Sequence, residues 1–309
     1  MRRVIGMHED RTLSRRHALG LLGGGLGATA LAPVLGASRL APEVPVDMPP
    51  HFPARADRVA FLLTPGGPRH GAASLALHTG SAVCRFPSVG AWAVYGRGRG
   101  SAELPGFVTL QPTLTHGGAG NWSAGFLPGD CQGAPLGDSA DPRTTLAHAL
   151  DRADLQSAGA AHGGSRARRR AAECAERLQR DSTRLLADGE ASAVAELLGR
   201  GVRFVQWTLA PSRPAGVLDE AAVAPVAALF DALESGDLLA KTRVLWAMPR
   251  SGSARPDYAL WAAGADSGRD LDPAGDLHAE VLAALGLDAR RLGHPLSGRA
   301  PATSALSRA

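Results

Sequence analysis

The chain has 309 residues, of which 45% are hydrophobic and 20% charged, so it is long enough for one large or two small domains with a real hydrophobic core. With 38 glycines, 22 prolines and only 5% aromatic residues, the composition favours a loop-rich protein and excludes a coiled coil. Basic residues exceed acidic ones by only 33 to 29, which argues against a nucleic-acid-binding surface. The three cysteines lie too far apart for a zinc knuckle or a dense disulfide framework.

Residues 1–40 have the order of an export signal. The adjacent Arg15 and Arg16 precede an apolar, glycine-rich run over 19–35, and the paired arginines are typical of the twin-arginine type. A transmembrane anchor is the alternative, but glycine and proline interrupt the run, and it is shorter than the roughly 20 residues of a spanning helix. We therefore expect the twin-arginine export machinery as a partner, a mature start near residues 37–42, and a periplasmic or extracellular location.

The first half of the mature chain is divided by proline and glycine. Residues 41–57 are proline-rich and predict an extended linker. The apolar run 58–63 ends at a Thr-Pro-Gly-Gly-Pro turn and predicts the first core strand. Between residues 71 and 137 we expect mostly loops and short elements, among them the apolar piece 107–110. Residues 143–199 have apolar residues at helical spacing and predict two or three helices.

The second half alternates between apolar runs and amphipathic patterns. We expect strands at 201–207, 242–246 and 258–261 and helices at 219–233 and 275–285. Strands separated by helices, several of them continuously apolar, indicate an α/β protein with a mostly parallel sheet and helices on both faces. The domain is expected to span residues 58–299, followed by a flexible tail at 300–309. Beyond the signal we expect no stable transmembrane segment.

A basic cluster begins the helical stretch in the middle of the chain. Its members are Arg166, Arg168, Arg169 and Arg170. Contact with nucleic acid is one interpretation, but Glu173 and Glu176 follow closely, and the chain has an export signal. A solvated helix face is therefore favoured, and no nucleic-acid partner is expected.

Short motifs occur in a fixed order along the mature chain. They are Phe-Pro-Ser-Val-Gly-Ala-Trp at 86–92, Leu-Pro-Gly-Phe-Val at 104–108, Gly-Phe-Leu-Pro with Gln-Gly within 125–133, Gly-Val-Arg-Phe-Val-Gln at 201–206, Leu-Leu with Thr-Arg-Val-Leu-Trp within 238–246, and Asp-Leu-His-Ala at 276–279. In this order they resemble the uncharacterised sulfatase-like proteins called domain of unknown function 1501. That family is placed in the alkaline phosphatase superfamily. The resemblance implies a parallel sheet between helix layers, with a metal centre at the carboxyl ends of the strands.

The resemblance also implies hydrolysis of phosphate or sulfate esters at a one- or two-metal site. Asp and His ligands suit zinc, calcium or manganese, which neutralise charge on the transferring group and activate a nucleophile. Asp276 and His278 match the family's motif, while His70, His78 and His116 are candidate ligands by neighbourhood only. Two alternatives remain open, namely a helix N-terminal acid for Asp276 and a surface residue of the first turn for His278.

The sequence departs from the family where further ligands are expected. After the strand at 204–207 the family carries Asp and His, but this chain continues Thr-Leu-Ala-Pro over 208–211. After the strand at 244–246 an acidic residue is expected, and the chain continues Ala-Met-Pro-Arg over 247–250. The segment after Gly66-Gly67-Pro68 is shortened, so the nucleophile position cannot be mapped.

These departures lead to two expectations for function. The first is an exported, shortened member of the family with an impaired or absent metal centre and a binding or vestigial role. The alternative is an active metal-dependent hydrolase of phosphate or sulfate esters, with rearranged ligands drawn from Asp276, His278, His70 and His116.

Three further features of the sequence bear on function. The glycine-rich run 116–122 invites a phosphate-loop interpretation, but it lacks the Lys-Ser/Thr ending, so a flexible loop is favoured. No serine lies in a Gly-x-Ser-x-Gly motif with an identifiable base and acid, and no catalytic triad is predicted. Cys84 and Cys131 pair in an oxidising compartment or remain two buried thiols; both alternatives stay open.

Overall fold

The computed structural model describes much of the chain between residues 44 and 294, with several gaps. The described residues are 44–66, 70–81, 86–112, 118–137, 165–210, 220–250, 258–265, 269–271 and 273–294. The signal residues Arg15 and Arg16 and the tail lie outside them. None of the described helices is both long and apolar enough to cross a membrane.

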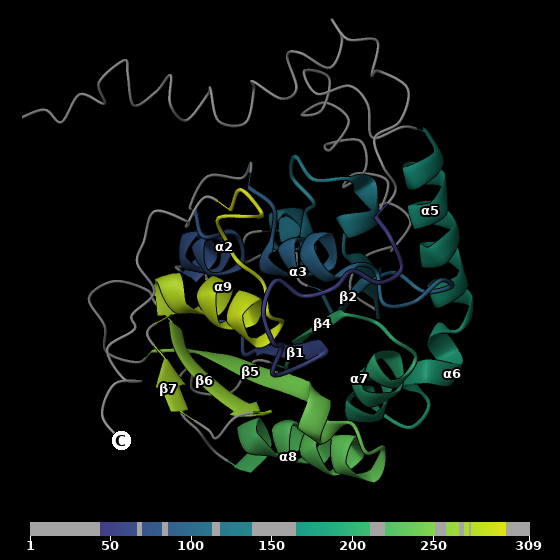
Figure 1. Ribbon diagram of the computed structural model, residues 1–309. Helices are drawn as coiled ribbons and strands as arrows, with labels where there is room; N and C mark the ends of the chain where they lie inside the picture. The colour runs from purple at the N-terminus through teal and green to yellow at the C-terminus, as the bar shows by residue number, and fades with distance from the viewer. Residues whose placement is uncertain are drawn as a thin grey trace, which may run out of the picture. The chain divides into compact units, whose positions relative to one another are not determined.

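A seven-stranded sheet forms the centre of the described structure (Figure 1), in the order β3-β2-β4-β1-β5-β6-β7. Its strands are β1 (Arg58–Leu63), β2 (Phe107–Leu110), β3 (Ala134–Leu136), β4 (Phe204–Thr208), β5 (Thr242–Pro249), β6 (Tyr258–Gly264) and β7 (Arg269–Leu271). Strands β1 to β5 pair in parallel, whereas β6 is antiparallel to both β5 and β7. The expectation of an α/β protein with a mostly parallel sheet is confirmed.

Helices lie on both faces of this sheet. They are α2 (Gly71–Thr79), α3 (Val89–Arg97), α5 (Ser165–Arg180), α6 (Ser182–Leu186), α7 (Glu190–Gly199), α8 (Glu220–Ser235) and α9 (Pro273–Ala284). Figure 1 shows α2, α3 and α9 over one face and α7 and α8 over the other. Two core clusters match these layers, because Phe61 and Leu63 point into one of them and Ala60 and Leu62 into the other. Burial on both faces explains why β1 is continuously apolar.

Strand β6 runs antiparallel to both of its neighbours in the mostly parallel sheet. Residues 258–261 form a strand as expected, but it pairs antiparallel with β5, so that Trp246 lies opposite Trp261. Strand β5 ends at Pro249 and β6 begins at Tyr258. A parallel crossover needs about a dozen residues or more, so this short connection permits only an antiparallel return.

The segment expected to be mostly loops contains two helices of nine residues, α2 and α3. Helix α3 begins after Ser88, whose hydroxyl accepts a hydrogen bond from Ala91 N. Helix α2 ends at Gly80, which has a left-handed φ of 70°. The glycines that suggested loops therefore include a helix terminator, and the expectation was wrong at these two helices.

The proline-rich residues 44–57 contain no helix or strand and are hydrogen-bonded to the rest of the domain. Arg99 N donates to the Pro45 carbonyl and Met48 N to the Arg97 carbonyl, at 3.0 Å each. Further along, Arg203 Nη1 donates to the Asp57 carbonyl at 2.7 Å. The segment that we expected to link two parts of the chain is bonded to the folded body.

Candidate functional site

The carboxyl ends of the parallel strands are the first place to look for a site, because open α/β sheets bind ligands there. Strands β4, β1 and β5 lie side by side, so their ends meet at one edge. Thr64 follows β1, and its buried hydroxyl accepts a hydrogen bond from Trp246 Nε1 at 3.0 Å. Thr208 ends β4 and Pro249 ends β5. These three positions carry neutral side chains, which agrees with the ligand losses noted in the sequence.

His70 is the candidate ligand that lies near this edge, immediately before α2. Its ring packs edge-on against Tyr258, with the ring centroids 5.6 Å apart. Both ring nitrogens are buried and have no hydrogen-bond partner in the described part of the chain. An imidazole without a partner is a costly arrangement, so His70 is a polar group that the described fold leaves unsatisfied.

His278, the histidine that matches the family motif, is buried with 1% exposure and not at the surface. Its Nε2 lies 3.0 Å from the backbone carbonyl of His78, and its Nδ1 lies 2.9 Å from Nε2 of His294. A carbonyl can only accept, so His278 Nε2 holds the proton. His278 Nδ1 therefore carries no proton and accepts a hydrogen bond, which His294 Nε2 donates. Both ring nitrogens of His278 are therefore used by the protein itself.

His78, His278 and His294 form what we call the histidine cluster. His78 Nδ1 donates to the Ser74 carbonyl at 2.7 Å, and its ring packs edge-on against Phe61. Burial lowers the pKa of His78 to about 4, that of His278 to about 3 and that of His294 to about 4. All three are neutral at physiological pH. The sequence did not predict His294, because no local pattern connects it to His278.

Among the described residues, the structure does not bring the candidate ligands together. His70 precedes the first turn of α2 and His78 lies at its other end, so they are roughly 12 Å apart along the helix axis. Because His278 contacts the His78 carbonyl, it lies at the far end of α2 from His70. His116 and the side chain of Asp276 lie outside the described residues.

The described residues do not fit a zinc, calcium or manganese centre. Within the ranges that the structure describes, no three His, Cys, Asp or Glu side chains are grouped so that they could hold a metal ion. The one motif-matched histidine in these ranges is committed to hydrogen bonds on both sides. We therefore derive no metal-dependent step.

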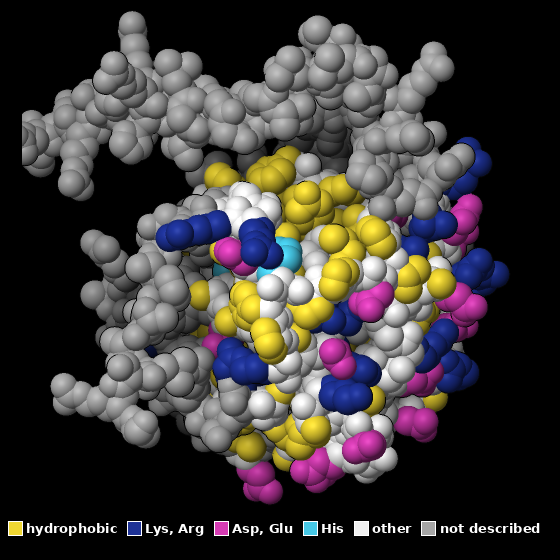
Figure 2. Space-filling model, viewed as in Figure 1, with side chains coloured by type: hydrophobic (Ala, Val, Ile, Leu, Met, Phe, Trp, Pro, Cys, Tyr) yellow, Lys and Arg dark blue, Asp and Glu magenta, His cyan; other side chains and the backbone are white. Residues whose placement is uncertain are grey.

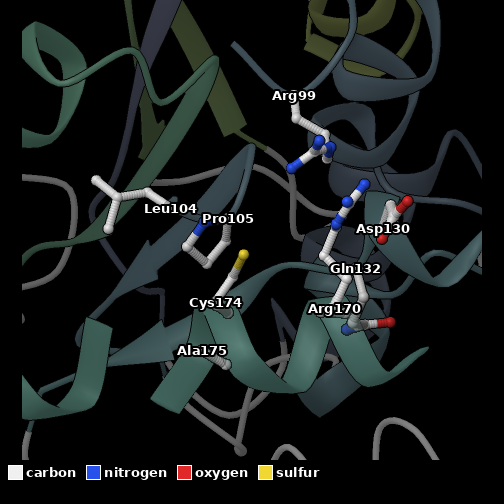
Figure 3. Close-up of a pocket in the computed structure, with 10 residues that line it drawn as sticks. Arg99, Leu104, Pro105, Asp130, Gln132, Arg170, Cys174 and Ala175 are labelled. Carbon is white, nitrogen blue, oxygen red and sulfur yellow. The ribbon is translucent and has the colours of Figure 1, made fainter. Parts of the chain in front are cut away.

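A second polar site is a small cavity of about 20 Å³ beneath α5 (Figure 3). It is lined by Arg99, Leu104, Pro105, Asp130, Gln132, Ala134, Arg170, Ala171, Cys174 and Ala175. Arg99 Nε donates to the Val44 carbonyl at 3.0 Å, and Asp130 Oδ2 accepts from Val44 N at 3.2 Å. The cavity has room for about one water molecule. Its buried polar groups hold the start of the described chain in place.

The thiol of Cys174 points into this cavity (Figure 3). Burial raises its pKa, an effect that the nearby Arg99 and Arg177 only partly offset. The thiolate is the nucleophilic form, so Cys174 is not activated. Cys131 is a free, buried thiol whose pKa burial raises well above its usual value, and Cys84 lies outside the described residues.

The glycine-rich run is not an open loop in its described part. Residues Gly118–Trp122 form a 3₁₀ helix in which Asn121 and Trp122 are buried. Asn121 Nδ2 donates to the Ser74 hydroxyl at 3.4 Å. The expectation of a flexible loop was wrong for these residues, which form a short helix whose Trp122 belongs to the core.

The histidine cluster predicts a pH-dependent stability. An unfolded histidine has its ordinary pKa of 6.5, whereas that of folded His78 is about 4. As pH falls from 6.5 towards 4, His78 takes up a proton in the unfolded chain but stays neutral in the folded chain. The free energy of unfolding should therefore fall by up to about 1.4 kcal/mol per pH unit for this group.

The variant His78→Gln isolates this contribution, since glutamine can still donate to the Ser74 carbonyl but does not titrate. The free energy of unfolding, measured with urea at several pH values in this interval, should depend less steeply on pH in the variant. The difference should correspond to the uptake of about one proton fewer on unfolding. An identical slope in both proteins would contradict the assignment.

Comparison with known proteins gives one match. No curated protein and no solved structure matches the chain. Residues 41–210, over half of the 309-residue chain, match the family described as "Protein of unknown function (DUF1501)". The match begins where the bonded proline-rich segment begins and ends just after β4. The chain therefore belongs to the DUF1501 family.

Proposed function

We propose that this protein is an exported DUF1501 member that acts by binding and not by metal-dependent ester hydrolysis. The observation that carries the proposal is the hydrogen bonding of His278, whose two ring nitrogens are engaged by His294 and by the His78 carbonyl. A metal ion would have to break one of these buried bonds. The neutral Thr64, Thr208 and Pro249 at the strand ends also support a binding role, because they supply no anionic ligand.

A shortened alkaline phosphatase/sulfatase-like arrangement is part of the same proposal. It is supported by the family motifs in the sequence and by the parallel strands β2, β4, β1 and β5 with helices on both faces. In that arrangement the sheet is a retained scaffold, and the ligand chemistry at its carboxyl edge has been replaced by neutral side chains.

An active metal-dependent hydrolase of phosphate or sulfate esters is the second candidate. The observation that favours it is His70, whose buried ring nitrogens lack partners close to the carboxyl edge of the sheet. In this candidate His70 would provide the first ligand, and the others would come from residues outside the described ranges.

Metal analysis separates the two candidates. The mature protein, purified without added metal, should carry less than one equivalent of zinc, calcium or manganese per chain. Its metal content should be unchanged in His278→Gln. Stoichiometric zinc, or hydrolysis of an aryl phosphate or aryl sulfate that a chelator and His70→Gln both abolish, would contradict the binding role and support the hydrolase.

Export is the second testable part of the proposal, and it is supported by the order of residues 1–40. A receptor that recognises the arginine pair uses the planar fork of donors, which lysine lacks. Changing Arg15→Lys together with Arg16→Lys should therefore retain the uncleaved precursor in the cytoplasm. Cell fractionation measures this, and normal export of the double variant would favour an ordinary secretory signal.

A further inference from the structure

A solvent-facing hollow of about 350 Å³ lies between the end of α5 and the end of α7. It is lined by Glu103, Leu104, Arg177, Arg180, Asp181 and Arg200. Leu104 is buried and provides an apolar part of the lining. Arginine is the commonest residue of this lining. Figure 2 shows basic and acidic side chains interleaved over the side of the molecule where α5, α6 and α7 lie.

Two acidic residues line the hollow; Asp181 is engaged by Arg200, whereas Glu103 forms no ion pair among the described residues. Asp181 Oδ2 accepts from Arg200 Nη1 at 3.3 Å and from Arg200 Nη2 at 3.4 Å. Glu196 pairs with Arg184 at 2.6 Å and with Arg200 at 3.5 Å. These carboxylates therefore neutralise Arg200 and Arg184, and they hold the Arg200 guanidinium in place.

Among the described residues, Arg177 and Arg180 have no anionic partner. Neither forms an ion pair within the described part of the chain, and Arg180 Nε donates only to the Glu176 backbone carbonyl at 3.4 Å.

Two guanidinium groups three residues apart on one helix repel each other. Their position in the last turn of α5 is favourable for the helix dipole, which explains why the helix tolerates them. The dipole does not satisfy the outward N–H donors, however. Both side chains are exposed, so these donors are available to a ligand in solution.

We propose that this hollow binds a tetrahedral oxyanion, a sulfate or phosphate group, through the guanidinium groups of Arg177 and Arg180. The planar fork of an arginine matches two oxygens of such a group, and charge-assisted bonds of this kind are strong. Arg200 lies at the wall of the hollow, but Asp181 and Glu196 neutralise it, so the attraction for the anion comes from Arg177 and Arg180. This site is independent of the metal status and of the carboxyl edge of the sheet.

The test uses the full mature protein with inorganic sulfate and inorganic phosphate as probes, at ionic strength held constant with chloride. Calorimetry should show saturable binding of at least one of them, and the side-chain Nε resonances of Arg177 and Arg180 should shift in NMR spectra. Changing Arg177→Gln with Arg180→Gln should weaken binding by about tenfold or more. A matched control, Arg290→Gln with Arg291→Gln, removes the same charge elsewhere and should leave binding unchanged.

The proposal is overturned if neither oxyanion binds saturably, if chloride or acetate produces equal shifts, or if the control variant loses affinity as much. Binding of sulfate alone or of phosphate alone supports the site and identifies its group. Should the double variant fail to fold by circular dichroism, the single Arg177→Gln variant decides, because unchanged affinity there would also overturn the proposal.

Discussion

Complete burial of the central strand is the constraint on which the rest of the structure depends. Strand β1 is paired with β4 on one side and β5 on the other, and helices cover both of its faces. From Val59 to Leu63 no residue of the strand is more than 1% exposed. Any polar group near such a strand must find a partner inside the protein, because a buried unpaired group costs about 1–3 kcal/mol.

The histidines show how differently this constraint is met at the two ends of α2. At its C-terminal end, His78 and the His278–His294 pair satisfy each other or nearby carbonyls, and burial keeps all three neutral. Before its N-terminal end, His70 has no such partner. Within the described residues, His278 has both ring nitrogens engaged, His78 has Nδ1 engaged but Nε2 buried without a partner, and His70 has neither engaged. His278 therefore has a structural role, whereas His70 has ring nitrogens, free in the described part of the chain, that a ligand in the second candidate function could use.

Much of the fold could be predicted from residue patterns, but little of the site could. The continuous apolar run 58–63 predicted a doubly covered strand, and amphipathic spacing predicted α8, because both signals are local. The direction of β6 depends on the length of its connection to β5, which the apolar pattern of the strand itself does not show. The partners of His278 come from other segments, one of them 16 residues away. The periodicity of a sequence does not show contacts between separate segments. For this reason His278 was expected to be a metal ligand, whereas in the structure it forms internal hydrogen bonds.

Imidazole nitrogen chemical shifts test the central claim most directly, because they distinguish a protonated ring nitrogen from a bare one and a bare one from a metal-bound one. We expect His278 to be protonated at Nε2 and bare at Nδ1, as its bonds to the His78 carbonyl and His294 require. This pattern should not change when zinc is added to the mature protein. A zinc-induced shift at His278 Nδ1, with loss of the bond to His294, would contradict the structural role and restore a metal centre.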